Sequence, residues 1–161
     1  LLPRLADLHL QALDALLYQM FKEGRFHSDP HAGNIVITPT GEVVFIDLGS
    51  AGQVEDARIP ELRKFFGGFI SQSGELVRDS VRAFVPDLDD AQLARIMDTI
   101  QTSGLDNRDK FQRILVLISE GGRAIDEGFE KFLKALATGA YLGRELPPER
   151  VAPSIFAYTN S

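Results

Sequence analysis

Apolar residues at three- and four-residue intervals predict an amphipathic helix over residues 3–23, because that spacing places them on one face. Gly24 follows directly, and glycine is the residue type preferred just past a helix C-terminus. We therefore expect a single helix that ends at Gly24. Its apolar face consists of Leu10, Leu13, Leu17, Met20 and Phe21.

Short apolar runs of the kind that form strands come next. Residues 35–37 read Ile-Val-Ile and residues 43–46 read Val-Val-Phe-Ile, with Thr-Pro-Thr-Gly-Glu between them. The proline and glycine of that linker are typical of a tight turn, so the two runs predict a β-hairpin. Because antiparallel pairing brings the ends of a hairpin together, Asn34 and Asp47 are expected to be neighbours.

Helical spacing dominates the chain after Asp56. We expect helices over residues 58–69, 91–102, 111–118 and 129–136, with Asp89 or Asp90 capping the second of them. The last stretch, Val151 to Ser161, is expected to be loose. The predicted fold class is α+β, in which residues 1–55 form a helix and hairpin and residues 56–161 form a helical bundle.

Composition narrows the classes of function. The chain has 161 residues and a net charge of −6. It has no cysteine, and this absence excludes a disulfide framework, a thiolate zinc site and a cysteine nucleophile. The acidic balance, without a Lys/Arg stripe, argues against nucleic-acid binding. No apolar run approaches the roughly 20 residues of a membrane span. Because the chain begins with Leu1 rather than Met, we expect it to be a fragment of something longer.

The residues with chemical potential gather at the two ends of the hairpin. His27, Asp29, His31 and Asn34 precede the first strand, and Asp47 follows the second. A carboxylate and an amide oxygen that converge in this way suit Mg²⁺, which takes a few protein ligands together with phosphate and water oxygens. Asp29 would remain free to accept a proton or to orient a nucleophile. The spacing matches the kinase templates H-x-D-x-x-x-x-N and D-x-G.

Each of these residues also has a plainer interpretation. Asp29 and Asn34 are residue types that form local turn hydrogen bonds, and His31 could be an ordinary surface residue. Taken together, however, they match one template, which favours the functional interpretation. Zinc is a weaker alternative, because Pro30 and Gly33 prevent the helix that would align His27 with His31, and the remaining histidine, His9, lies on the preceding helix.

A family resemblance follows from these motifs. Residues 24–35, Gly-Arg-Phe-His-Ser-Asp-Pro-His-Ala-Gly-Asn-Ile, resemble the loop Gly-x-Phe-His-Ala-Asp-Pro-His-Pro-Gly-Asn of the AarF/UbiB family of atypical kinases. Residues 41–52 match the family's second motif, usually Asp-Phe-Gly with a further glycine three residues later. Leu48 replaces the usual phenylalanine and Ala32 the usual proline, and neither change removes a ligand. The resemblance at motif level covers about residues 5–55.

The resemblance implies a protein-kinase-like C-lobe that uses ATP and Mg²⁺. It makes Asp29 the catalytic aspartate and Asn34 and Asp47 the Mg²⁺ ligands. His31 takes the position where ordinary protein kinases often have a lysine near the γ-phosphate. His27, Gly33 and Gly49 are assigned to the nucleotide-facing set, with Gly49 permitting the turn after Asp47.

The family also implies a link to ubiquinone or other isoprenoid-quinone lipid metabolism. A lipid or quinone-precursor ligand and a membrane surface are the partners it suggests, with a peripheral location on the cytoplasmic face of a bacterial membrane or in mitochondria. The family's Lys-x-Gly-Gln segment, its Ala-rich nucleotide loop and its strand lysine have no counterpart here. We therefore expect that the N-lobe is missing and that this chain alone is inactive.

Two other functions remain open at this point. An aminoglycoside- or choline-phosphotransferase-like kinase shares H-x-D-x-H-x-x-N, but its second motif commonly carries an acidic residue that 47–52 lack beyond Asp47 itself. A truncated, non-catalytic binding module is the other alternative. All motif acids are present here, which speaks against decay by mutation.

Overall fold

The first helix and the turn that ends it lead the chain into the polar loop. The computed structural model describes residues 5–144 and 146–159, and in it α1 (Leu5–Tyr18) is followed by one π-helical turn, Gln19–Glu23. Gly24 then takes a left-handed conformation with φ of 70°. The predicted helix is confirmed, except that its last turn is π-helical. The prediction also included residues 3 and 4, which lie outside the described residues.

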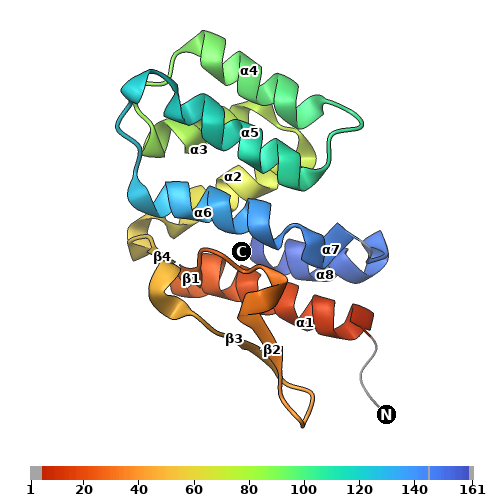
Figure 1. The fold of residues 1–161 in the computed structure, drawn as a ribbon. Coiled ribbons are helices and arrows are strands. Elements are labelled where there is room, and N and C mark those ends of the chain that lie inside the picture. The colour runs from red at the N-terminus through yellow and green to blue at the C-terminus, as the bar shows by residue number, and fades with distance from the viewer. Residues whose placement is uncertain (1–4, 145, 160–161) are drawn as a thin grey trace.

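Two small antiparallel sheets follow. The predicted hairpin is present as β2 (Ile35–Ile37) and β3 (Val43–Phe45), and Gly41 provides the positive φ of its turn, 86°. The second sheet, which was not predicted, pairs β1 (Arg25–His27) with β4 (Ala51–Gln53). It clamps together the two ends of the segment that carries the polar residues, so that the whole segment projects as one unit beneath α1 (Figure 1).

The rest of the chain is helical, as predicted. Aspartates cap three of its helices: Asp89 forms a reciprocal capping box with Gln92, while Asp106 and Asp126 accept from the N–H groups of Asp109 and Phe129. No helix in the described part of the chain is both long and apolar enough to cross a membrane. The helices are α2 (Ile59–Ser71), α3 (Gly74–Phe84), α4 (Asp90–Gln101), α5 (Asn107–Ser119), α6 (Glu127–Gly139), α7 (Tyr141–Arg144) and α8 (Pro148–Thr159).

The expectation of a loose end from Val151 is wrong over the described residues, because these belong to α8. Pro148 occupies the first position of that helix, where a missing N–H costs nothing, and α8 accommodates Pro153 in its interior. Burial holds the helix in place: Tyr158 is buried, and its hydroxyl donates to Asp14 of α1 at 3.4 Å. Residues 160 and 161 lie outside the described residues.

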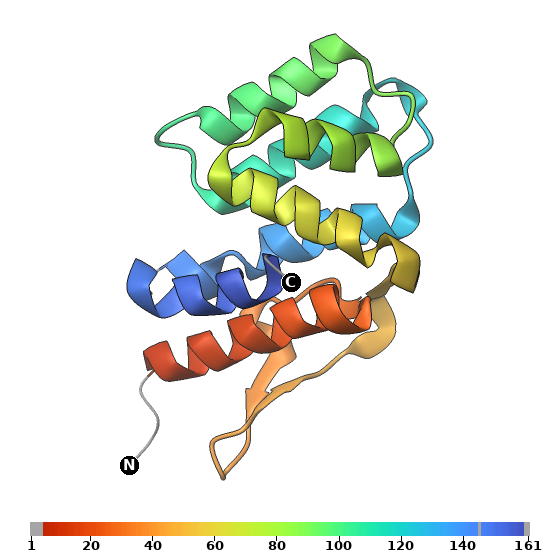
Figure 2. The same cartoon turned by 180° about the vertical axis from the view of Figure 1, so that it is seen from behind.

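The helices form two groups with α6 between them. Figures 1 and 2 show α2, α3, α4 and α5 on one side of α6, and α1, α7 and α8 with the small sheets on the other. Aromatic side chains fill the centre: Phe129 of α6 stacks on Phe84 with ring centroids 4.5 Å apart and meets Phe65 edge-to-face at 5.5 Å. Because α1 also packs on α7 and α8, the segment carrying the polar loop rests on the same core as the helical bundle.

Candidate catalytic and metal-binding site

His27 joins the loop that carries Asp29 to the end of the hairpin that precedes Asp47. Its side chain is only 2% exposed; Nε2–H donates to the carbonyl of Ile46 at 2.7 Å, and Nδ1 accepts from the N–H of Asp29 at 3.0 Å. The His27 N–H itself donates to Oε1 of Gln19 at 3.0 Å. Both ring nitrogens are therefore occupied, so the geometry makes His27 a positioning residue rather than one that contacts a nucleotide.

Asp29 and His31 lie next to each other at the open face of the loop. Nε2 of His31 is 3.7 Å from Oδ2 of Asp29, and the two side chains are 52% and 49% exposed. Nδ1 of His31 accepts from the Gly33 N–H at 3.0 Å, which leaves Nε2 protonated toward the carboxylate when the ring is neutral. The carboxylate of Asp29 is thus half-exposed and available, while its backbone N–H and carbonyl hold the loop.

Gly33 makes room for the His31 ring. A Cβ at this position would lie 2.8 Å from Cε1 and 3.0 Å from Nδ1 of that ring. The sequence motif therefore has a local physical reason, since a side chain at residue 33 would push His31 away from Asp29.

Asn34 is buried and oriented by the loop. Its Nδ2 donates to the Asp29 carbonyl at 2.9 Å, which directs one end of the amide into the loop and leaves Oδ1 as the available ligand atom. The local turn bond expected under the plainer interpretation is therefore present, but it uses only the amide nitrogen. It orients the side chain without consuming the oxygen that a metal would need.

Asp47 is held close to Asn34 by the hairpin. The N–H of Ile46 donates to the Asn34 carbonyl at 2.8 Å, which continues the β2–β3 pairing by one step toward the site. Asp47 itself is exposed and has φ of 61° and ψ of 65°, an uncommon conformation for a residue with a side chain. The left-handed residue is therefore Asp47, and Gly49 lies within the turn that follows it.

Gly49 belongs to the 3₁₀ turn Leu48–Ser50, and a Cβ built on it would be 3.7 Å from Oδ1 of Asp47. That is an ordinary van der Waals distance, so the space beside the carboxylate would accept a small side chain. The N–H of Ser28 donates to the Ser50 carbonyl at 3.1 Å, so the turn after Asp47 is also tied directly to the loop before Asp29.

The donor set fits Mg²⁺ better than a metal held entirely by protein. Within the described residues no group of three or more His, Cys, Asp or Glu side chains is arranged to hold an ion. One amide oxygen, from Asn34, and one carboxylate, from Asp47, leave most coordination positions to phosphate and water, as Mg²⁺ prefers.

The back of the loop rests on residues that no motif in the sequence singles out. The Tyr141 hydroxyl donates to the carbonyl of buried Pro30 at 3.1 Å, and burial raises the pKa of that hydroxyl above its usual value. Nζ of Lys131 donates to the Ala51 carbonyl at 3.3 Å. Both lie about a hundred residues downstream, where no local pattern could reveal their partner.

The mostly helical α+β architecture is consistent with a kinase-like fold, and comparison with known proteins points to the same family as the motifs. Residues 4–81 match the family model of the ABC1 atypical kinase-like domain. The chain is 25% identical over 150 residues to the Arabidopsis thaliana protein ACTIVITY OF BC1 COMPLEX KINASE 7, chloroplastic, covering 86% of this chain and 22% of that protein. It is 33% identical over 70 residues to an uncharacterized Synechocystis protein, covering 43% and 12% of the two chains.

A further Arabidopsis relative, ACTIVITY OF BC1 COMPLEX KINASE 3, chloroplastic, is 38% identical over 56 residues, or 34% of this chain and 8% of that protein. The chain is similar to the AarF/UbiB-type family of atypical kinases over residues 4–81, in agreement with its motifs. It spans less than a quarter of the length of each of these relatives.

Proposed function

We propose that this chain supplies the catalytic loop and the Mg²⁺ ligands of an ATP-dependent phosphotransferase or ATPase. One observation carries the proposal: the Ile46–Asn34 hydrogen bond at 2.8 Å brings the Asp47 end of the hairpin to the loop that presents Asp29. Asp29 acts on the attacking hydroxyl or water as proton acceptor or orienting group. Asn34 and Asp47 hold the metal.

Asn34 and Asp47 would hold a Mg²⁺ ion, which when bound would supply positive charge to offset the negative charge of the phosphates. The chain's own contribution is positional. The Asn34 side chain is oriented by its hydrogen bond to the Asp29 carbonyl. Asp47 is positioned by the hydrogen bond from His27 to the carbonyl of the preceding residue, Ile46. His31 stands beside Asp29, where its exposed ring can donate a hydrogen bond to a phosphate oxygen.

The hairpin supports the expectation that another part of the protein completes the nucleotide site. Several of its apolar side chains are about 40% exposed, and Leu48, next to Asp47, is 70% exposed. Val36 and Val44 are direct partners across the hairpin and so share one face, and an exposed apolar face usually marks a contact site. We propose that an N-lobe covers it and encloses ATP between the two lobes. The exposed side chains on and beside the hairpin are Val36, Ile37, Val44, Ile46 and Leu48.

The resemblance also supports a role in ubiquinone or isoprenoid-quinone lipid metabolism at a membrane surface. We propose that the protein acts peripherally there, on the cytoplasmic face of a bacterial membrane or in mitochondria, with a lipid or quinone precursor as its ligand. A peripheral role of this kind does not require the hairpin or the loop to insert into the membrane.

ATP turnover by a polypeptide that joins this chain to an N-lobe tests the proposal. Asp47→Asn should lower turnover more than His31→Ala does, because Asp47 brings the only full negative charge among the proposed ligands and Asn34 is neutral. Loss of an oxyanion-type donor typically costs ~10²–10³ in rate, and we expect His31→Ala to fall at or below that range. If Asp47→Asn kept near-normal turnover at ordinary Mg²⁺ while His31→Ala abolished it, the metal assignment would be wrong.

A complementary measurement uses the present chain alone. We expect Mg·ATP to bind it weakly or not at all in calorimetry, since the N-lobe donors to the phosphates are absent. Micromolar affinity would show that this lobe carries more of the nucleotide pocket than proposed.

A further inference from the structure

A small recess lies directly beside the catalytic loop. It has a volume of about 310 Å³, and its lining includes His31 and Ala32 from the loop, Arg108 of α5, and Tyr141 and Arg144 of α7. His31 is the residue that faces Asp29. A group bound in this recess would therefore be next to the proposed catalytic residues.

The two arginines of the recess are available to a ligand. No ion pair or hydrogen bond is found for the side chain of Arg108 or Arg144 within residues 5–144 and 146–159, and both residues are exposed. Elsewhere in the chain, Arg58 and Arg82 are paired with the carboxylates of Asp126 and Asp90. In a protein of net charge −6, two uncompensated guanidinium groups at one recess favour an anion.

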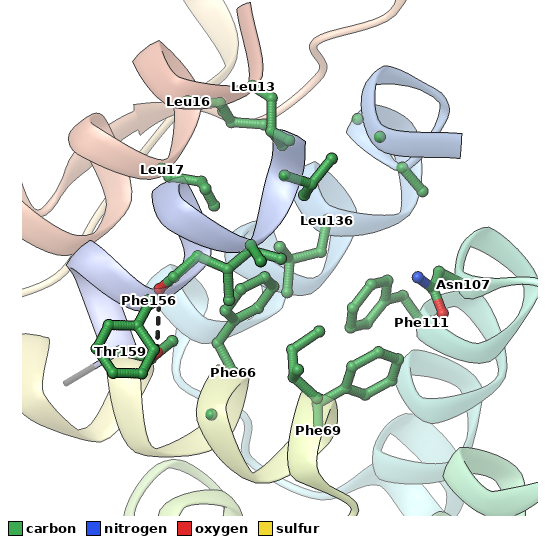
Figure 3. A pocket seen from close by; sticks show the side chains of 18 of the residues that line it. Leu13, Leu16, Leu17, Phe66, Phe69, Asn107, Phe111, Leu136, Phe156 and Thr159 are labelled. Atoms are coloured by element: carbon green, nitrogen blue, oxygen red, sulfur yellow. Dashed lines mark hydrogen bonds between the residues drawn. The ribbon is translucent and has the colours of Figure 1, made fainter. Parts of the chain in front are cut away.

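A much larger apolar cavity begins at the same arginines. It has a volume of about 1200 Å³ and is bordered by α1, α2, α5 and α8, and Arg108 and Arg144 line it as well as the recess. Figure 3 shows leucines of α1 on one side of it and phenylalanines of α2 and α5 on the other. The labelled apolar residues of these walls are Leu13, Leu16, Leu17, Phe66, Phe69 and Phe111.

The other cationic side chains on its border are already engaged. Nζ of Lys64 lies 3.3 Å from Glu61, and Arg63 donates to the carbonyl of Phe21 at 3.1 Å. The unpaired guanidinium groups thus lie where the cavity meets the recess. The rest of the wall is mostly apolar, with Asp106, Asn107, Ser71 and Thr159 among its polar members. Asp106 caps α5 by accepting from the Asp109 N–H.

We propose that recess and cavity together bind a single-chain amphiphile with an anionic head, a phosphate or carboxylate. The head lies between Arg108 and Arg144, beside His31, and the apolar tail extends into the cavity toward α1 and α2. If the proposed function holds, on which this assignment rests, the amphiphile occupies the substrate position beside the catalytic loop. Its binding requires neither ATP nor Mg²⁺.

Binding of monododecyl phosphate to the 161-residue chain, measured by calorimetry below the critical micelle concentration and without nucleotide or metal, tests the site. Arg108→Gln and Arg144→Gln should each weaken binding about tenfold, the effect of losing one charge-assisted contact. Arg113→Gln is the matched control, because Arg113 lies on the same helix, is exposed and lines neither space. Equal affinity of all three variants and the unmodified chain would overturn the proposal.

The tail is tested separately. Affinity should rise about threefold to fourfold per methylene from octyl to dodecyl phosphate, because each methylene that leaves water for the cavity adds a favourable transfer free energy. Ala152→Phe, at an exposed residue of α8 that lines the cavity, should weaken dodecyl phosphate binding. Inorganic phosphate that bound as tightly as dodecyl phosphate would instead show a site for soluble anions and refute the amphiphile. Because no ATP or Mg²⁺ is present, these outcomes are independent of whether Asp47 binds metal.

Discussion

Replacing His27 with alanine should destabilise the protein strongly, although the residue is expected to touch no nucleotide. The ring is buried and links segments nineteen residues apart, through the Ile46 carbonyl at 2.7 Å and the Asp29 N–H at 3.0 Å. Its ring also packs near that of Phe45, with centroids 6.0 Å apart. Alanine would remove both hydrogen bonds and leave a space between the loop and the hairpin.

The magnitude follows from these contacts. A hydrogen bond contributes a net ~1 kcal/mol, and a partner left unsatisfied in a buried place costs ~1–3 kcal/mol. Water can reach the Ile46 carbonyl in part, since Ile46 itself is exposed, so the lower end of that range applies there. We expect a total loss of about 2–4 kcal/mol, a large part of the ~5–15 kcal/mol that stabilises an ordinary domain.

Guanidinium unfolding of the chain followed by circular dichroism measures this loss. His31→Ala is the control, because that ring is half-exposed and should cost at most ~1 kcal/mol. His27→Gln should recover part of the loss, since an amide can still donate to the Ile46 carbonyl. A His27→Ala variant no less stable than His31→Ala would refute the reasoning that His27 holds the two halves of the site together.

Three further substitutions test the local packing. Gly33→Ala should leave stability within about 0.5–1 kcal/mol of the original but shift the His31 ring signals in NMR spectra, because its Cβ would lie 2.8 Å from that ring; unchanged signals would contradict the contact. Gly52→Ala should cost about 1–3 kcal/mol in guanidinium unfolding, because its Cβ would collide with the buried ring of Phe26. Tyr141→Phe should cost ~0.5–1.5 kcal/mol through the lost bond to Pro30. Burial raises the folded-state pKa of Tyr141, so the stability that its hydroxyl contributes is fully present below pH 10 and declines as pH rises from there toward the folded pKa. A difference in unfolding free energy between the unmodified chain and Tyr141→Phe that stayed constant from pH 8 to 11 would count against this.

The sequence predicted the parts of the fold that local pattern encodes. Helical spacing and the Asp89 cap located α4 to within a residue or two, and the turn with Gly41 located the hairpin, because both depend on residues close in sequence. The β1–β4 pair could not be predicted, since three-residue strands have too little periodicity to recognise. Nor could α8, where tertiary contacts of Tyr158 override the weak helical preference around Pro153.

The site shows the same division. Motif spacing predicted Asp29, Asn34 and Asp47 as site residues, and the hairpin pairing that was expected to bring them together is present. The left-handed backbone at Asp47 was not predictable, because only a surrounding structure that fixes the turn makes a residue with a side chain adopt it. The support from Tyr141 depends on contact across more than a hundred residues and leaves no trace in the local sequence.

Paramagnetic broadening by Mn²⁺, a substitute for Mg²⁺, tests the shared metal site most directly. In nitrogen–proton NMR spectra of the chain, low concentrations of Mn²⁺ should broaden the Asn34 side-chain amide and the backbone amides around Asp47 before other signals. Excess Mg²⁺ should reverse the broadening and Asp47→Asn should abolish it, while Asp56→Asn, at an exposed residue outside the site, should leave it intact. Broadening that ignores Asp47→Asn, or that affects residues near Asp47 but not the Asn34 amide, would contradict a site shared by these two side chains.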